Sequence, residues 1–296
     1  MVLCMKKLRK LFSVILVIAA IACLLFATIL FFRYSQEDEN TNTLLDELRP
    51  ITENSLQPSV SSNIVSTESV SGTISVSESD STTDTEPIPS EEPTRIPNPY
   101  AESYLANDDM VGWLIIPGTN VDYPVMWTPG DENYYLYREF DEKDNANGCL
   151  ILDTDSSLEP LTTNLIIHGH NMKSGAMFGN LTDFEDEEYF KEHSVITLHT
   201  RECVHNYEIV AVFRSQVYKK KDEVFKFYKF FQADTEEEFY DFYDNIKDLS
   251  LYDTGITAEF GDRFITLSTC VYHVENGRFV IVAKEIEPGD YYLPIE

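Results

Sequence analysis

Basic residues are scarce in this sequence. Its 296 residues include 22 Lys and Arg against 51 Asp and Glu, so the formal net charge is -29 at pH 7. Proteins that bind DNA or RNA neutralise phosphates with basic patches, and this composition argues against that class of function. The acidic surface by itself names no partner, because net charge mainly keeps a protein soluble and apart from other molecules.

Cysteine is also sparse, with five residues in the chain. Cys4 and Cys23 fall in an apolar N-terminal stretch, which leaves Cys149, Cys203 and Cys270. Three is an odd number, so at least one of these thiols stays free. Cys149 and Cys203 lie in or beside predicted strands, where most thiols are buried and inert. A disulfide between them is possible, but no spacing rule supports it. Cys270 is the thiol that requires an explanation.

One long apolar run, LFSVILVIAAIACLLFATILFF, fills residues 11–32. As a helix it would extend about 33 Å, enough to cross a hydrocarbon core of about 30 Å. A cleavable signal peptide is the alternative, but its apolar region would be roughly 7–15 residues long and followed by a small-residue cleavage site. Residues 1–33 are therefore predicted to be a cytoplasmic basic stub and a single-pass anchor, with everything after Arg33 outside the cell. The basic residues before the run are Lys6, Lys7, Arg9 and Lys10.

The segment after the anchor has a different composition. Residues 34–97 are rich in Ser, Thr, Glu and Pro and show no sustained apolar period. Such a segment buries too little apolar surface to offset the entropy lost on ordering. We expect a disordered stalk, with at most a short helix in TLLDELRP, that spaces a folded head of residues 98–296 from the bilayer.

The head contains eight short runs of apolar, β-branched and aromatic residues, from VGWLIIP to GRFVIVAKEI, and no visible internal repeat. Runs of this kind, separated by Gly, Pro, Asn and Asp, are typical of a closed barrel or a sandwich. NPYAESYLAND predicts an opening helix. TEEEFYDFYDNIKDL begins with a Thr/Glu capping pattern and predicts a longer helix. Its apolar stripe is predicted to pack on the barrel; the stripe comprises Phe239, Phe242, Tyr243 and Ile246.

A thiol that attacks a carbonyl group needs a nearby base or imidazolium and a group that holds the oxyanion. NLIIHGHNMKSGAMFGNL ends an apolar run with two histidines. Alternation places His168 on the strand, whereas His170 follows Gly169, where its side chain could lie over a cleft. Zinc is the alternative, with His168, His170, Cys203 and His205 as ligands, but these spacings match no strong zinc pattern.

Several motifs together carry a resemblance to a known family. TLSTC ends in Cys270, GHN includes His170, and GRFVIVAK includes Arg278. In this order they resemble the sortases, cysteine transpeptidases of Gram-positive bacteria. NDDMVGWLIIPGTNVDYPVMW, ENYYLYREF and GCLILD are similar to class B of that family. The resemblance covers about residues 98–290, and the anchor and polar stalk agree with class B topology.

The resemblance implies a mainly β fold, a closed eight-stranded β-barrel with a few peripheral helices, including an N-terminal helix and a long helix before the cysteine strand. It implies Cys270 as nucleophile, His170 as acid and base, and Arg278 as the group that binds substrate and stabilises the oxyanion. Such an enzyme cleaves a sorting signal of surface proteins after Thr, holds the protein as a thioester and transfers it to a peptidoglycan amine. No cofactor or metal is implied, and the head is expected to be monomeric.

Further residues are candidates for contact with the substrate peptide. Val271 follows the cysteine where some class B members have an acidic residue nearby, so no carboxylate can be assigned to orient His170. The substrate-binding candidates are Ser268, Thr266, Asn133, Leu136 and Tyr228.

Three alternative functions remain open on the sequence. One is a class B enzyme that polymerises pilins, another is a different thiol enzyme acting on peptidoglycan, and the third is a stalked surface adhesin or binding module. The adhesin gives no reason for a free thiol beside Arg278.

Overall fold

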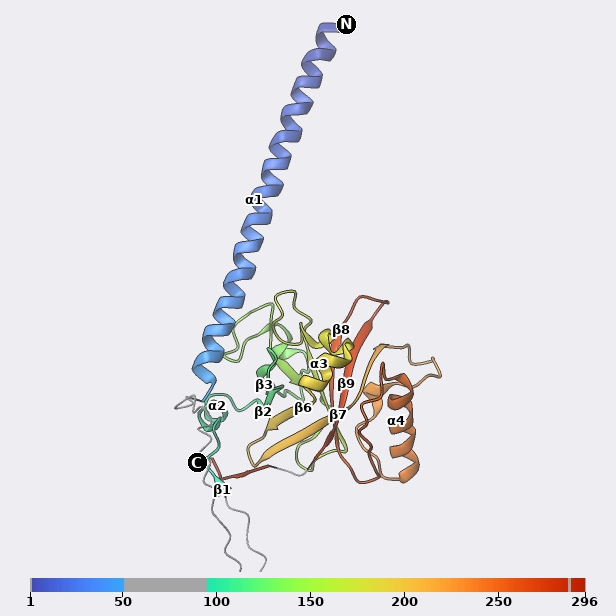
Figure 1. Cartoon of the computed structure of the whole chain (residues 1–296). Helices are drawn as coiled ribbons and strands as arrows, with labels where there is room; N and C mark the ends of the chain where they lie inside the picture. The colour runs from blue at the N-terminus through green and yellow to red at the C-terminus, as the bar shows by residue number, and fades with distance from the viewer. Residues whose placement is uncertain (1, 51–94, 287–288, 296) are drawn as a thin grey trace, which may run out of the picture.

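The computed structural model describes residues 2–50, 95–286 and 289–295, with side chains from Ile15 onward in the N-terminal helix. At its centre is a closed barrel (Figure 1), which confirms the predicted eight-stranded barrel. Around the barrel, neighbouring strands follow the order β2 (Met110–Ile115), β3 (Asp122–Met126), β4 (Leu150–Leu152), β5 (Asn164–Gly169), β8 (Phe264–Cys270), β9 (Gly277–Glu285), β7 (Val204–Gln216) and β6 (Val195–His199).

Two short strands and several short helices lie outside the barrel. β1 (Arg95–Ile96) pairs in parallel with β10 (Tyr291–Tyr292), outside the barrel. The predicted opening helix is α2 (Ala101–Ala106). The remaining short helices are η1 (Tyr134–Tyr137), η2 (Leu181–Glu185), α3 (Glu187–Glu192) and η3 (Phe227–Lys229).

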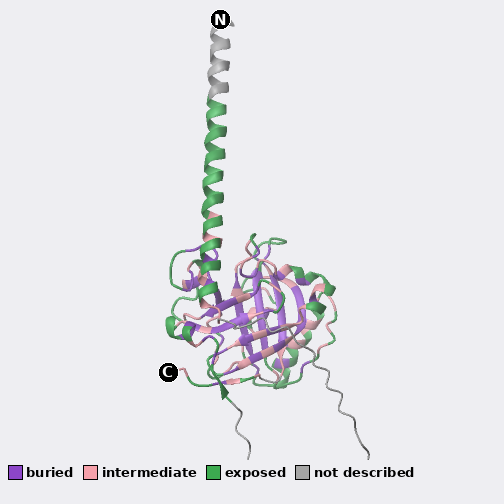
Figure 2. Ribbon diagram, turned by 60° about the vertical axis from the view of Figure 1, so that its left-hand side comes forward, coloured by how far each residue is buried: buried purple, intermediate pink, exposed green. Residues whose placement is uncertain are grey.

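Strands β7, β8 and β9 are buried along most of their length (Figure 2). Leu267 and Ile281 belong to the core that fills the barrel, whereas Phe264 and Val280 belong to a second cluster shared with α4 (Glu236–Leu249). Burial on both faces explains why these strands read as near-continuous apolar runs rather than as alternating ones.

Helix α4 is the predicted long helix, and it directly precedes the segment that leads into β8. Thr235 and Glu238 form the capping box expected from the sequence. On the barrel side of α4, the ring of Phe242 stacks on Phe230 with centroids 3.9 Å apart, and Phe239 lies over Phe264 at 5.4 Å. The predicted packing role of the aromatic stripe is confirmed.

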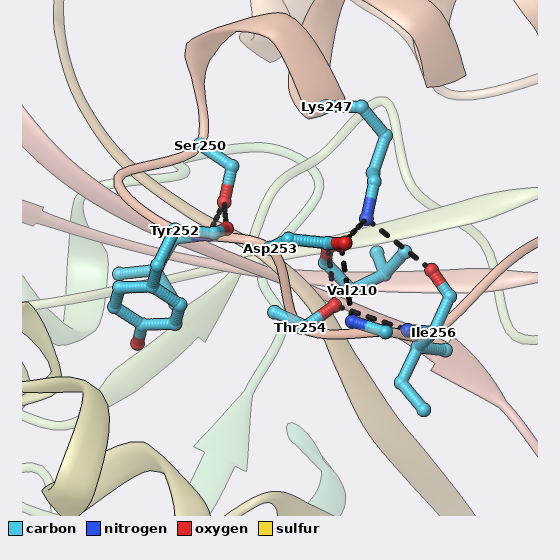
Figure 3. Close-up of polar contacts among 9 residues, drawn as sticks. Val210, Lys247, Ser250, Tyr252, Asp253, Thr254 and Ile256 are labelled. Atoms are coloured by element: carbon cyan, nitrogen blue, oxygen red, sulfur yellow. Dashed lines mark hydrogen bonds and ion pairs between the residues drawn. The ribbon is translucent and has the colours of Figure 1, made fainter.

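The loop between α4 and β8 is fastened to β7 by polar contacts (Figure 3). Lys247 Nζ lies 3.1 Å from Asp253 Oδ1, and Thr254 Oγ1 donates to the Val210 carbonyl oxygen at 3.0 Å. Ser250 Oγ donates to the Tyr252 carbonyl oxygen at 2.8 Å. The Thr254 bond joins this segment to β7, whereas the other two contacts lie within the segment that runs from the last turn of α4 to β8 and fix its local shape.

The N-terminal helix α1 (Val2–Leu48) is longer than the predicted anchor. It is the one helix, among the residues described, that is long and apolar enough to cross a membrane. Its residues 34–48 continue beyond the apolar run, so residues 34–42 are helical rather than disordered, and the short helix allowed in TLLDELRP is the end of α1. The rest of that prediction, residues 51–94, lies outside the described part of the chain.

The last turns of α1 continue as helix because they pack on the head. Leu45 is only 4% exposed and belongs to the main core, with Leu44 and Leu48 packed beside it. Thr41 Oγ1 donates to Glu139 Oε1 at 3.0 Å, and Arg49 Nε lies 2.7 Å from Asp122 Oδ2. The folded unit therefore includes residues that precede position 98.

Helix α1 projects from the head on the side where the β8–β9 turn lies (Figure 1). The same end of the barrel carries the end of β5, because β5 and β8 run parallel. The direction of α1 is thus linked, through its packing on the head, to the end of the barrel that holds Cys270.

Candidate active site

Three adjacent strands bring the predicted residues of the site to one end of the barrel. Cys270 is the last residue of β8, and its register partner on β9 is Arg278. On the other side of β8, Thr269 pairs with Gly169, and His170 follows directly. The structure therefore places Cys270, His170 and Arg278 at neighbouring strand ends, although His170 is far from the other two in sequence.

A tight turn sets Arg278 opposite Cys270. The Val271 N–H donates to the Gly277 carbonyl oxygen at 3.0 Å, and the Gly277 N–H donates to the Val274 carbonyl oxygen at 3.1 Å. A Cβ atom on Gly277 would lie 2.3 Å from the Val271 carbonyl oxygen, a distance that only glycine avoids. The glycine before Arg278 is thus required by the turn that forms the site.

Hydrogen bonds between β5 and β8 fix the backbone of the thiol residue. Asn171 Nδ2 donates to the Cys270 carbonyl oxygen at 2.8 Å, and Thr269 Oγ1 donates to the Gly169 carbonyl oxygen at 2.7 Å. The Cys270 residue itself is exposed, so a substrate can reach its thiol.

A backbone carbonyl group orients His170. Its Nε2 lies 2.8 Å from the Leu136 carbonyl oxygen, and the ring of Tyr137 is 5.2 Å away between centroids. Because a carbonyl oxygen only accepts, Nε2 carries the proton and a neutral imidazole leaves Nδ1 as the base. Every residue has a backbone carbonyl group, so the sequence could not show which one orients His170. The motif ENYYLYREF indicated Leu136 only as a residue that lines the substrate groove.

The Arg278 guanidinium is held by its own turn. Nη1 donates to the carbonyl oxygens of Asn276 at 3.4 Å and Gly277 at 3.1 Å. Within the described part of the chain no other atom of this guanidinium makes a hydrogen bond, so Nε and Nη2 can donate to a ligand. Two donors in one rigid plane suit an oxyanion or a peptide carbonyl.

The two hydroxyl residues predicted on β8 lie in the barrel wall. Thr266 is fully buried, and its Oγ1 donates to Asn164 Oδ1 at 2.9 Å. This position gives Thr266 a structural bond and no access to a peptide. Ser268 is 2% exposed, and its buried Oγ has no hydrogen-bond partner among the described residues.

The other substrate-binding candidates are distributed around this end of the barrel. Asn133 is exposed at the start of η1, and half-buried Leu136 reaches His170 through its carbonyl group. Tyr228 in η3 accepts a hydrogen bond on its hydroxyl from the Tyr218 N–H at 2.9 Å. The preceding Val217 N–H donates to the Asn276 carbonyl oxygen, which places Tyr228 near the turn before Arg278.

The second histidine of the motif has a different environment. His168 Nε2 lies 3.1 Å from Asp153 Oδ2. Burial alone would raise the pKa of Asp153, but the hydrogen bonds from His168 and from the Asp155 N–H lower it below its usual value. His168 thus has a partner within the barrel wall, in agreement with its predicted place on the strand.

The zinc alternative requires residues that the barrel separates. His168 and His170 lie at the end of β5, whereas Cys203 and His205 lie at the start of β7, at the opposite end of the barrel. Cys149 and Cys203 are both free and buried, and they too lie near opposite ends. The structure therefore forms neither the four-ligand group nor the disulfide.

Comparisons with known proteins agree with this geometry. The family model described as a Sortase domain matches residues 114–286. A sortase B of Listeria monocytogenes is 33% identical over 184 residues, which cover 60% of this chain and 70% of the relative.

Solved structures give the same result. A substrate complex of Staphylococcus aureus sortase B aligns with a TM-score of 0.58 at 25% identity, covering 65% of this chain and 87% of that one. Clostridium perfringens sortase B aligns with a TM-score of 0.56 at 28% identity, covering 63% and 98%. A barrel that carries a cysteine, a histidine and an arginine on adjacent strand ends, together with these matches over most of the head, leads to one conclusion: this chain belongs to the sortase family of cysteine transpeptidases, in class B.

Proposed function

We propose that this protein is a membrane-anchored transpeptidase that cleaves a sorting signal after Thr and joins the released protein to a peptidoglycan amine. The observation that carries the proposal is the register of the strand ends, with Cys270 opposite Arg278 and His170 on the neighbouring strand. Cys270 is the nucleophile, His170 the acid and base, and Arg278 the oxyanion donor.

The reaction runs in two acyl transfers. His170 Nδ1 first takes the proton of the Cys270 thiol. The thiolate then attacks the Thr carbonyl carbon, and the oxygen takes up negative charge beside the Arg278 guanidinium. His170 donates a proton to the leaving amine, and a thioester remains on Cys270. The incoming amine then attacks the thioester, His170 takes its proton, and the thiolate is released as the new amide bond forms.

The solved complex of S. aureus sortase B with a substrate supports a peptide as the first partner. A panel of fluorogenic peptides with Thr-Gly and Thr-Asn bonds, tested with and without an added amine, examines the proposed function. Cleavage after Thr that increases with the amine supports transpeptidation, and preference for a lysine-bearing protein acceptor over a peptidoglycan fragment would favour pilin polymerisation. Absence of cleavage across the panel would count against the proposed specificity.

The proposal places the apolar part of α1 in the bilayer and the head outside the cell. Because the last turns of α1 pack on the head, the anchor and the barrel have a fixed relative direction. The end of the barrel with Cys270 then faces the membrane, so the enzyme would act on a sorting signal and an amine that are held near the bilayer surface.

Replacing Arg278 tests whether the guanidinium plane or only its charge is needed. Lysine supplies a compact ammonium in place of the planar fork, and losing one oxyanion donor typically costs about 10²–10³ in rate. We expect both Arg278→Lys and Arg278→Ala to lower kcat/KM on a cleaved peptide by about this factor, with unchanged melting temperature. Arg201→Lys, at the other end of the barrel, is the control. A folded Arg278→Lys enzyme within about threefold of wild type would exclude the guanidinium as the oxyanion donor.

Two truncated chains test where the folded unit begins. A chain that starts at residue 34 keeps the packed turns of α1 and is expected to be soluble, monomeric and fully active on peptides. A chain that starts at residue 98 loses Leu45 from the core, and truncating one buried leucine to alanine typically costs about 2–5 kcal/mol. We expect the second chain to melt at a clearly lower temperature. Equal melting temperatures, or activity that requires residues 11–32 in detergent, would contradict this boundary.

A further inference from the structure

A second thiol with an imidazole partner lies at the end of the barrel opposite Cys270. Cys203 Sγ is 3.3 Å from His205 Nε2, and His205 Nδ1 is 2.6 Å from Glu285 Oε1. Arg263 Nε lies 2.7 Å from the other oxygen of the same carboxylate. The Cys203 thiol, the His205 imidazole and the Glu285 carboxylate therefore form a continuous series of polar contacts. The Arg263 guanidinium pairs with the same carboxylate.

Strand topology brings these residues together. β7 begins where β9 ends, and Tyr207 is the register partner of Glu285. Cys203, His205 and Tyr207 alternate with more exposed residues, so they share one side of the chain at this barrel end. Cys203 and His205 are 7% and 9% exposed, which shields their contact from bulk water.

Charges around the pair favour a protonated imidazole. Burial alone would lower the pKa of His205, but the contacts with Cys203 and Glu285 raise it to about 9. Burial would raise the pKa of Glu285, whereas its bonds to His205 and Arg263 lower it. An imidazolium that donates from both nitrogens stabilises a thiolate at one and a carboxylate at the other. The other titratable or charged groups facing this cluster are Tyr207, Tyr292, Arg201, Glu202, Asp108 and Glu159.

A cavity of about 460 Å³ gives access to the pair. Cys203 and His205 line it together with Arg263, and Trp127 and Leu158 contribute apolar wall. A space of this size admits a small molecule.

We propose that Cys203 is a second reactive thiol of this protein, which undergoes thiol–disulfide exchange with small disulfides that enter this cavity. The sulfur of Cys203 attacks one sulfur of the disulfide RSSR; a bond from Cys203 to that sulfur forms and the original S–S bond breaks. The leaving RS⁻ takes up the proton that the Cys203 thiol lost, so the products are a mixed disulfide and RSH. This exchange does not depend on the transpeptidase reaction, because the two thiols lie at opposite barrel ends.

Cys149 provides a control within the same molecule. It is also buried, but burial raises its pKa, with further contributions from Glu139 and Asp141. No imidazole contacts its sulfur among the residues described. Burial alone therefore predicts an inert thiol at Cys149, whereas the imidazolium predicts a reactive one at Cys203.

The experiment uses the full chain carrying Cys270→Ala in detergent micelles, with bis(2-hydroxyethyl) disulfide as the probe. Site-resolved mass spectrometry follows the modification of each cysteine at pH 6.5 and pH 9. An ordinary thiol with a pKa of about 8.5 loses roughly 50–100-fold in rate between these two values. We expect the reaction rate of Cys203 to fall by less than about tenfold from pH 9 to pH 6.5. At pH 6.5, Cys149 should react more than about tenfold more slowly than Cys203.

Substitutions of His205 and Glu285 test whether these residues activate the Cys203 thiol or whether the thiol is merely accessible to the probe. His205→Gln and Glu285→Gln are both expected to restore the ordinary pH dependence at Cys203, whereas Cys203→Ser should leave peptide cleavage by the otherwise wild-type enzyme unchanged. If one of these variants does not fold, the ratio of the Cys203 reaction rates at pH 9 and pH 6.5 in the Cys270→Ala chain still tests the proposal. An unmodified Cys203 in the native chain that reacts after denaturation in guanidinium, or an ordinary pH dependence in the native chain, would overturn the proposal.

Discussion

Cys270→Ala is expected to abolish peptide cleavage and amide formation, because no other residue in the proposed site can form the thioester. The residue ends β8 with an exposed thiol, opposite Arg278, and its carbonyl oxygen is held by Asn171. Alanine keeps these backbone contacts, so the loss should come without unfolding. Initial rates on a cleaved peptide and a thermal melt measure the two effects.

Cys149→Ala and Cys203→Ala are the matched controls, since both thiols are buried and lie outside the proposed site. Each is expected to keep most of the activity. Retention of more than about one per cent of wild-type turnover by Cys270→Ala would exclude Cys270 as an essential nucleophile, since covalent and acid–base groups usually contribute at least about 10² in rate.

His170→Ala is expected to reduce kcat/KM by about 10²–10⁴, the usual contribution of a general acid and base. His170 follows β5 next to the end of the cysteine strand, and the Leu136 carbonyl oxygen fixes its ring. Without the imidazole, the leaving amine has no proton donor and the incoming amine no base. The measurement is kcat/KM on the same peptide, with circular dichroism to confirm the fold.

His168→Ala is the matched control, because this histidine is two residues away and belongs to the barrel wall. It loses its bond to Asp153, so we expect a lower melting temperature with only mildly reduced activity. Equal and complete loss of activity in both variants would contradict the separate roles, and metal found in the purified protein would then favour a metal site.

Short apolar runs bounded by turn residues predicted a barrel or a sandwich, and the resemblance to the sortases implied the closed eight-stranded barrel that the structure has. The packing face of α4 followed from its aromatic residues at helical spacing, and Phe239 and Phe242 do lie against the barrel. The family motifs indicated Cys270, His170 and Arg278, and only the strand register shows that these residues are neighbours.

Other features could not be predicted, each for a physical reason. The sequence allowed a short helix that includes Leu45, but its continuity with the anchor and its docking depend on contacts of Leu45 and Thr41 with a distant part of the chain. The orienting group of His170 is a backbone carbonyl, which every residue possesses. The contacts that link Cys203 to Glu285 through His205 could not be predicted, because Glu285 lies on another strand, far away in the sequence.

The most direct test of the central claim is the mass of the enzyme after rapid acid quenching in the presence of a cleavable sorting-signal peptide. The proposed mechanism predicts an added mass equal to the fragment that ends in Thr, located on the peptide that contains Cys270. A peptidoglycan-type amine should remove this mass and yield the amide product at the same rate. Cleavage that proceeds with no adduct on Cys270, or an adduct that the amine does not discharge, would contradict the mechanism.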